Sequence, residues 1–426
     1  MKKKLFTLLL CAFACINAGA ARYSVVSNGD GSVTITKFAA DETTVAKTAA
    51  DAENLSLTTD EQTTVGAATK LVLVGYFSDY DFTNVLKSYN TIVTELDLTD
   101  AMLDQSTVNE DKGYYIIVKE GDVEVMYTVT HDTVNNKYYY IDNNNNQVEV
   151  DEANVEDRRS VSGGQRIPSD WQNTLTTISL PTSPDFKNLG NDFCNNLINL
   201  TSITIPTNIE VIGENAFTNC TSMTSVTFSH PSKLQIIGYH SFYLTSLTEV
   251  TIPATVEYVG IDAFGVINTL QKVVFADVQS GETAAEYVTV KTNAFNNSKA
   301  ITDVYIDNST VKIDCENGAF DFDTTWAHGD PTQATATLHF PQKFASNYAN
   351  LAHPLTMEDA GDAAKFHDWL MEHYSQAQTK TNGWYEFKNN GTTDPDPGAP
   401  QGNISKFLRT YCDMENDRLV PEGVKA

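Results

Sequence analysis

The most constraining feature of this sequence is a short phrase that recurs every 23 or so residues. The phrase L-x-x-I-x-I-P spans 175–181, 200–206 and 247–253, with degraded copies from 223, 270 and 301 and a last one ending in "LHFP" at 338–341. The first five starts are separated by 25, 23, 24 and 23 residues, and the step of 31 to the next predicts an insertion at "DVQSGETAAE". A fixed period in this range predicts a solenoid, because one unit cannot bury its own apolar face.

A second phrase follows in each unit and ends in phenylalanine. It reads "VIGENAF", "IIGYHSF" and "YVGIDAF". The alternating apolar residues of the first phrase predict a strand that the proline ends. The glycine is expected to permit a tight bend. The phenylalanines predict one buried ladder: Phe193, Phe217, Phe242, Phe264, Phe295 and Phe320.

The combined string L-x-x-I-x-I-P-x-x-V-x-x-I-G-x-x-A-F-x-x-C resembles the BspA-like leucine-rich repeat family. The match is specific over residues 175–270 and looser to about 345. Cys220 matches the terminal cysteine of the motif, which other units replace with Asn196, Thr245, Ile267 and Ser298. The resemblance implies a mainly β leucine-rich repeat solenoid in a surface adhesin or interaction protein.

The remaining segments are expected to flank or interrupt the solenoid of residues 171–345. Residues 21–104 are predicted to cap its start, with a hairpin at "NGDG". The strands and turns of 105–170 predict an inserted β-meander. Residues 346–388 are expected to close the solenoid with a C-terminal helix at 356–380, and 389–403 have the composition of a linker. Residues 404–426 are too few for a core, so they either pack on the cap or begin a truncated further segment.

The first 20 residues have the pattern of an export signal. A basic "MKKK" precedes the apolar "LFTLLLCAFACI", and "AGA" ends at residue 20. Lipidation at Cys15 is the alternative, which would make the chain an outer-membrane lipoprotein. No other apolar run reaches the roughly 18 residues that a membrane helix needs. The sequence therefore predicts a secreted or cell-surface protein.

Composition narrows the classes of partner. The formal net charge is -27, with 28 basic and 55 acidic residues, which disfavours nucleic acid and anionic membranes. The cysteines after the signal are Cys194, Cys220, Cys315 and Cys412. Their spacing matches no zinc site, and their disulfide state is left open. Cys220 and Cys315 fall where other repeats place small or apolar residues, which predicts buried apolar roles.

Sequence motifs for catalysis, cofactors or metals are not found. The chain has no nucleophile elbow, zincin motif or phosphate-binding loop. His367 and His373 are six residues apart and suit a helical metal pair poorly. "DNNNNQVEVDEA" begins like a calcium loop but lacks its glycine and final glutamate, so we interpret it as a turn, and "DFDTT" at 321–325 could offer only a weak surface cation site. We therefore expect no enzyme, no cofactor and no resident metal.

The third and fifth positions of each strand phrase are expected to point outward. In the first three units they are Thr177, Ser179, Ser202, Thr204, Ser225 and Thr227. Charged and aromatic residues appear only later, and these are the candidate ligand-binding residues: Glu249, Lys272, Asp303, Tyr305 and His339. The rival site is the meander, through Tyr138, Tyr139 and Tyr140. The alternative is ordinary strand filling at both places.

Binding is the function that these observations predict best. A protein ligand is favoured over a glycan because Tyr305 is the lone aromatic on the outward positions. Polysaccharide capture is the second hypothesis and an enzyme the third.

Overall fold

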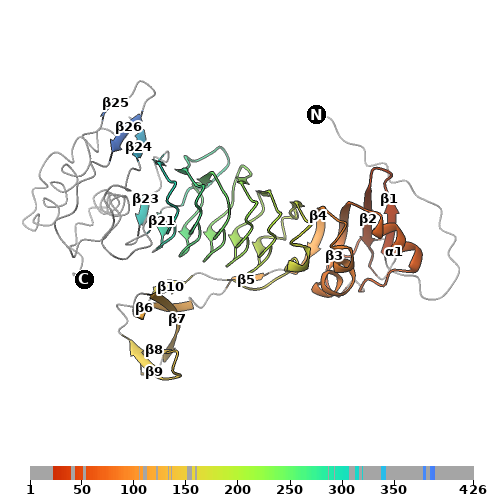
Figure 1. The fold of residues 1–426 in the computed structure, drawn as a ribbon, viewed down its shortest axis with the longest axis horizontal. Helices are drawn as coiled ribbons and strands as arrows, with labels where there is room; N and C mark the ends of the chain where they lie inside the picture. The colour runs from red at the N-terminus through yellow and green to blue at the C-terminus, as the bar shows by residue number, and fades with distance from the viewer. Residues whose placement is uncertain are drawn as a thin grey trace, which may run out of the picture.

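The computed structural model of the protein describes residues 23–341 with short gaps, together with 378–379 and 384–388 (Figure 1). The gaps are residues 40–43, 51–53, 105, 109–112, 121–122, 133, 136, 151–155, 159–160, 286, 292, 307–311, 316–318 and 320–336. The expected signal, linker and final segment lie outside the described residues, as do His367, His373 and "DFDTT".

The first strand phrase of each repeat forms one column of parallel strands. Its members are β2 (Ser32–Lys37), β3 (Lys70–Phe77), β4 (Glu95–Leu103), β12 (Thr177–Ser179), β14 (Ser202–Ile205), β16 (Ser225–Phe228), β18 (Glu249–Ile252), β20 (Lys272–Phe275), β22 (Asp303–Ile306) and β24 (Thr337–Pro341). Pairing is parallel within β2-β3-β4-β12, β14-β16 and β18-β20-β22-β24, with a register shift between Val72 and Val74 where β3 pairs with β4. We call the outward side of this column the strand face (Figure 1).

The second phrase of each repeat forms another parallel column. Its six strands pair in chain order: β13 (Asn188–Leu189), β15 (Val211–Ile212), β17 (Ile236–Ile237), β19 (Tyr258–Val259), β21 (Tyr287–Val290) and β23 (Lys312–Cys315). The predicted mainly β repeat fold is therefore confirmed. The strand column extends back into the N-terminal segment, because β4 pairs directly with β12 of the first repeat and β3 pairs with β4.

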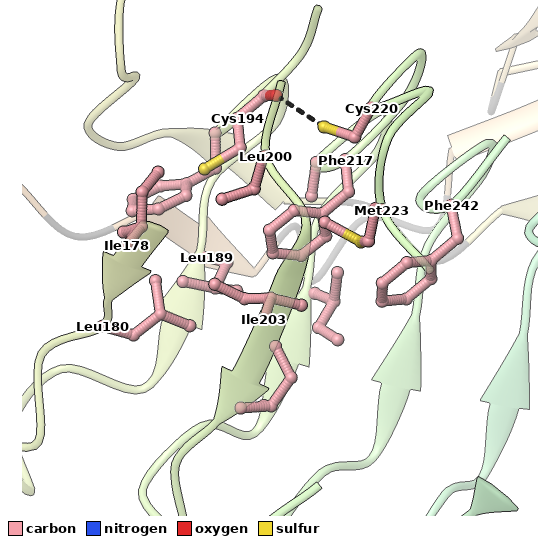
Figure 2. Close-up of a cluster of buried hydrophobic side chains, with 14 of the residues drawn as sticks. Ile178, Leu180, Leu189, Cys194, Leu200, Ile203, Phe217, Cys220, Met223 and Phe242 are labelled. Carbon is pink, nitrogen blue, oxygen red and sulfur yellow. Dashed lines mark hydrogen bonds between the residues drawn. The ribbon is translucent and has the colours of Figure 1, made fainter. Parts of the chain in front are cut away.

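The space between the two columns is filled by apolar side chains (Figure 2). One buried cluster runs from Val33 to Ala319. Leu175, Leu200, Met223, Leu247 and Leu270, the first residues of successive repeats, are all fully buried in it. Sharing one core explains why no single coil has to bury its own apolar surface.

The phenylalanine ladder is confirmed over its described members. Phe193, Phe217, Phe242, Phe264 and Phe295 are all 0% exposed. Ring centroids of successive rings from Phe217 to Phe295 lie 5.2–5.3 Å apart. Phe320 lies outside the described residues. Burial of large rings in each coil supplies much of the hydrophobic stabilisation.

The expected role of the repeat glycines was wrong. Gly213, Gly238 and Gly260 do not adopt the positive φ that a glycine-specific bend would use. Instead, a Cβ on Gly238 would lie 2.9 Å from the carbonyl carbon of Gly213 in the preceding coil, and one on Gly260 2.8 Å from that of Gly238. Glycine is needed there because neighbouring backbones approach too closely for any side chain.

A ladder of threonines holds the coils together at the start of the strand column. The residue just before each strand donates its backbone N–H to the equivalent residue of the preceding coil, as Thr201 does to Thr176 at 3.2 Å and Thr224 to Thr201 at 2.9 Å. The threonine hydroxyls repeat the same bond, and Thr176 reaches Thr94 in the N-terminal segment. The ladder therefore joins that segment to the repeats.

The N-terminal segment packs around its own buried ion pair. β1 (Tyr23–Ser27) forms the predicted hairpin with β2. Helix α1 (Thr59–Gly66) begins with a capping box at Thr58, and π-helix η1 (Asp81–Val85) and 3-10 helix η2 (Leu86–Tyr89) follow β3. Lys37 Nζ lies 2.7 Å from Asp81 Oδ2, with both side chains at most 2% exposed. Asp81 also accepts the backbone N–H of Leu55 and Ser78.

Residues between β4 and β12 hold a separate antiparallel sheet, which leaves the line of the coils in Figure 1. Its order is β10 (Glu156–Arg158), β6 (Gly113–Glu120), β7 (Val123–Asp132), β8 (Lys137–Ile141) and β9 (Gln147–Val150). β5 (Ser106–Val108) pairs with β11 (Val161–Gly163) at its base, and 3-10 helix η4 (Ser169–Trp171) follows. Asp142 accepts the backbone N–H of Asn144 and Asn146, which confirms that "DNNNN" is a turn.

At the far end, β24 pairs antiparallel with β26 (Trp384–Lys388), which pairs with β25 (Gln378–Thr379). The helix predicted for 356–380 lies outside the described residues except at its end. There the prediction was wrong, because 378–379 are a strand held by cross-strand hydrogen bonds that override the local helical pattern.

Candidate functional site

The strand face presents two outward residues from each coil, as the alternation predicted. Ser202, Thr204, Ser225 and Thr227 are exposed, and the apolar residues between and after them point into the core. Register then places the third positions of Glu249, Lys272 and Asp303 side by side. The fifth positions of Val274, Tyr305 and His339 form the parallel row.

Three of the five candidate residues form one contact group, which we call the Lys272 cluster: Glu249, Lys272 and Tyr305. Lys272 Nζ lies 3.8 Å from Glu249 Oε2 and 5.2 Å from the centroid of the Tyr305 ring. The ammonium is therefore held between a carboxylate and the negative face of an aromatic ring. The side chains of Lys272 and Glu249 are 43% and 66% exposed, so a partner could contact them directly.

The other two candidates extend this surface along the strands. Asp303 is half-buried in β22, opposite Lys272, and accepts the hydroxyl of Thr302 at 2.7 Å. His339 lies in β24 opposite Tyr305. The structure thus brings all five predicted positions onto adjoining strands of one face.

A second charged group on the strand face was missed by the sequence reasoning. Lys70 Nζ lies 3.3 Å from Asp97 Oδ2 and 3.9 Å from Glu95 Oε2. Burial raises the pKa of Asp97, but hydrogen bonds from Thr99 and Lys70 outweigh it, so that this pKa lies below its ordinary value. The signal was available in "TKLVLV" and "VTELDL", which repeat the strand phrase with charged outward residues.

The rival site in the meander follows the ordinary strand pattern. Tyr138 and Tyr140 are buried with Tyr127, whose ring centroid lies 4.6 Å from that of Tyr140. Tyr139, between them, is only half-buried. Two of the three tyrosines are thus core residues of the small sheet, which leaves little of the cluster for a contact surface.

The cysteines of the repeats serve packing. Cys194 and Cys220 are buried and free, and the Cys220 thiol donates to the carbonyl of Cys194 at 3.2 Å (Figure 2). Burial raises the pKa of Cys220 to about 12 and that of Cys194 well above its ordinary value. Both thiols stay protonated at neutral pH and are poor nucleophiles.

No group of three or more potential metal ligands gathers in the part of the chain that the structure describes. Within the same residues, no helix combines the length and apolarity needed to cross a membrane.

Residues 187–325 match a family described as "BspA type Leucine rich repeat region", in 6 copies. Two solved structures are similar in part. The pneumococcal vaccine antigen PcpA is 18% identical, with 45% of this chain and 50% of that chain covered and a TM-score of 0.22, so the match spans about half of PcpA. A leucine rich cell surface protein from Faecalibacterium prausnitzii A2-165 is 14% identical, with 71% and 73% covered and a TM-score of 0.27. No curated protein matches the chain.

Proposed function

We propose that this chain is an exported surface protein that binds another protein. The proposal starts from residues 187–325, which match the BspA-type leucine-rich repeat region. The chain is a solenoid without catalytic activity, and its strand face carries the contact. The signal-like first 20 residues support export. Repeat proteins of this architecture use their extended strand surfaces for binding.

The observation that carries the proposal is the Lys272 cluster. Binding energy concentrates in charged and aromatic side chains that lose water at a contact. On the strand face, Lys272 and Tyr305 are such residues, and each already holds the other in place. The hydroxyl residues of β14 and β16 offer no comparable anchor.

The same geometry disfavours glycan capture. A sugar ring binds by stacking on an open aromatic face, and Lys272 lies over the Tyr305 ring. A polysaccharide would first have to displace this ammonium. We therefore retain the glycan only as an outcome of the test.

The test is direct binding of the exported chain, residues 21–426, to panels of extracellular-matrix proteins and of polysaccharides. For a protein that binds, Lys272→Ala and Tyr305→Ala should each weaken the affinity by about 1 kcal/mol or more. Their effects should not add, because the two side chains touch. The matched control is Ser202→Ala with Ser225→Ala on the same face.

Two outcomes would overturn the proposal. Full affinity in the Lys272/Tyr305 double variant, together with loss on deleting residues 113–150, would move the site to the meander. Binding to polysaccharides alone would replace the protein partner with a glycan.

A further inference from the structure

Each coil turns sharply after its second strand, and the turns repeat the same backbone. In each, two residues four apart adopt positive φ. At the first position these residues are Asp192, Asn215, His240, Asp262 and Asn293, and at the second Asn196, Asn219, Leu244, Val266 and Asn297. Asparagine and aspartate tolerate this left-handed conformation best after glycine. The five coils therefore provide an internal comparison of what the turn prefers.

Two adjoining coils depart from this preference. His240 (φ 53°) and Leu244 (φ 57°) stand where other coils have Asp or Asn, and Val266 (φ 56°) does so in the next coil. A left-handed conformation costs Leu244 and Val266 about 1–2 kcal/mol each, whereas histidine adopts it more readily, as Asn and Asp do. Asparagine would relieve that strain at Leu244 and at Val266. Strain that one substitution would remove points to a role outside folding.

His240 is the centre of an aromatic stack. Its ring centroid lies 3.8 Å from that of Tyr239 and 4.2 Å from that of Tyr243, with planes tilted by 18° and 19°. Its Nε2 lies 3.5 Å from Asp262 Oδ2 in the next coil. We call Tyr239, His240, Tyr243, Leu244 and Asp262 the turn cluster.

Gly265 makes room for this cluster. A Cβ at Gly265 would lie 3.1 Å from Tyr243 Cδ2 and 3.0 Å from Asp262 Oδ1. Its φ is not positive, so the turn itself does not demand glycine. The other coils have Asn195, Thr218, Tyr243 and Asn296 at the equivalent position. Several repeat positions in two coils therefore change together around one aromatic stack.

The cluster is partly exposed. Leu244 is 38% exposed, and the side chains of His240 and Asp262 are 22% and 17% exposed. Asp262 Oδ1 is buried and has no hydrogen-bond partner among the described residues, so the contact with His240 is made by Oδ2 alone. Burial, and next the carboxylate of Asp262, raise the pKa of Tyr243 above its ordinary value, so its hydroxyl stays protonated.

We propose that the turn cluster is a second docking surface, which takes a basic segment of a protein partner through arginine or lysine side chains. The aliphatic stem of such a residue packs on Leu244 and the neighbouring tyrosine rings, while its cationic head lies beside the partly exposed Asp262 carboxylate and is attracted by its charge. The chain has 55 acidic and 28 basic residues, and this net negative charge also attracts a positively charged partner. This surface lies on the turns of the coils, so it is a binding site in addition to the one proposed on the strand face.

A glycan fits this surface less well. Both faces of the His240 ring are covered by tyrosines, and the Tyr243 ring also lies against Gly265. Stacking with a sugar needs an open ring face, which the His240 ring does not offer. The charge of Asp262 adds a preference for a cation that a neutral sugar does not satisfy.

The experiment measures binding of an acetylated hexa-arginine peptide to residues 21–426 by calorimetry at about 0.15 M salt, where distant surface charges are screened. Asp262→Asn and Leu244→Asn are the test variants, because both place asparagine where the turn prefers it. Each should weaken binding at least fivefold. Leu244→Asn should also leave the melting temperature unchanged or raise it, which a purely structural role for Leu244 would not allow.

The charge-matched control is Asp185→Asn, which removes one exposed carboxylate far from the turn cluster in the sequence. It should change the affinity less than twofold. Equal weakening by Asp185→Asn and Asp262→Asn would mean diffuse attraction to an acidic protein and would overturn the proposal. No measurable binding of the peptide, or unchanged binding to Leu244→Asn, would overturn it as well.

Discussion

The rings of Phe242 and Phe264 lie parallel in successive coils, with centroids 5.2 Å apart and planes tilted by only 1°. Each ring is fully buried. The spacing of these centroids is close to the distance between neighbouring strands, so the ladder advances with the backbone of the coils. Phe242 and Phe264 therefore each pack on the ring before and the ring after.

Replacing one ring should leave a cavity that the stacked backbone cannot close. Phe242→Ala is expected to lower the free energy of unfolding by about 3–5 kcal/mol, from lost burial and the cavity together. Chemical denaturation monitored by circular dichroism measures it. The exposed Leu244→Ala, two residues away, is the matched control and should cost far less. A denaturation midpoint for Phe242→Ala equal to that of the parent would contradict the ladder's role.

The repeat glycines give a sharper test of coil spacing. Gly238→Ala would place a Cβ 2.9 Å from backbone atoms of the preceding coil, so the two coils would have to move apart. We expect a destabilisation of about 1–3 kcal/mol from this overpacking. Gly66→Ala is the control, since its Cβ would meet nothing closer than 3.8 Å. Equal stability of Gly238→Ala and Gly66→Ala would contradict the close approach of the two backbones as the reason for glycine at position 238.

Features tied to the period of the repeat could be predicted from the sequence. The buried phenylalanines and the outward positions of the strands follow from spacing alone, because every coil must satisfy the same geometry. The threonine ladder had the same kind of signal, since Thr176, Thr201 and Thr248 each follow the leucine that starts a repeat. It was missed because the hydroxyl bonds run between coils and not within one.

Features that depend on one contact between distant segments could not be predicted. Lys37 and Asp81 are 44 residues apart, and no periodicity connects them. In the sequence, the turn cluster differs from the other coils only by residues other than Asn and Asp at the turn positions. That difference can be recognised only once the structure shows which positions are left-handed. The role of the repeat glycines was misjudged because a glycine in a sequence can indicate either a bend or a close approach of two backbones, and the sequence does not distinguish them.

The buried ion pair of the N-terminal segment should be sensitive to loss of one partner. Asp81→Ala would leave the Lys37 ammonium, with a side chain 2% exposed, without its counter-charge. We expect a cost of about 3–5 kcal/mol in the free energy of unfolding. Lys70→Ala, which breaks a partly exposed pair with Asp97, should cost less, about 1 kcal/mol. Thermal melts of both variants at one pH and salt concentration compare them, and similar losses would refute the burial argument.

The insertion after β20 is fastened to an earlier coil by one carboxylate, and that contact should depend on pH. Glu282 has a fully buried side chain and accepts from the backbone N–H of Ser232 at 2.8 Å and of Gln279 at 2.9 Å, with His230 Nδ1 2.7 Å away. Burial raises the pKa of Glu282, but the bonds to Ser232, Gln279 and His230 outweigh it and hold this pKa below its ordinary value of 4.5.

Because the pKa of Glu282 is lower in the folded state than in the unfolded state, its ionised carboxylate stabilises the fold at pH values above the unfolded pKa. This stabilisation is lost as the pH falls through the folded pKa. Glu282→Gln should therefore cost about 1–3 kcal/mol at pH 7, since a buried acceptor is lost, and progressively less below about pH 4.5. Denaturation of the parent and the variant across this pH range measures the difference. A gap that stays constant from pH 7 to well below 4.5 would show that the carboxylate charge does not hold the insertion in place.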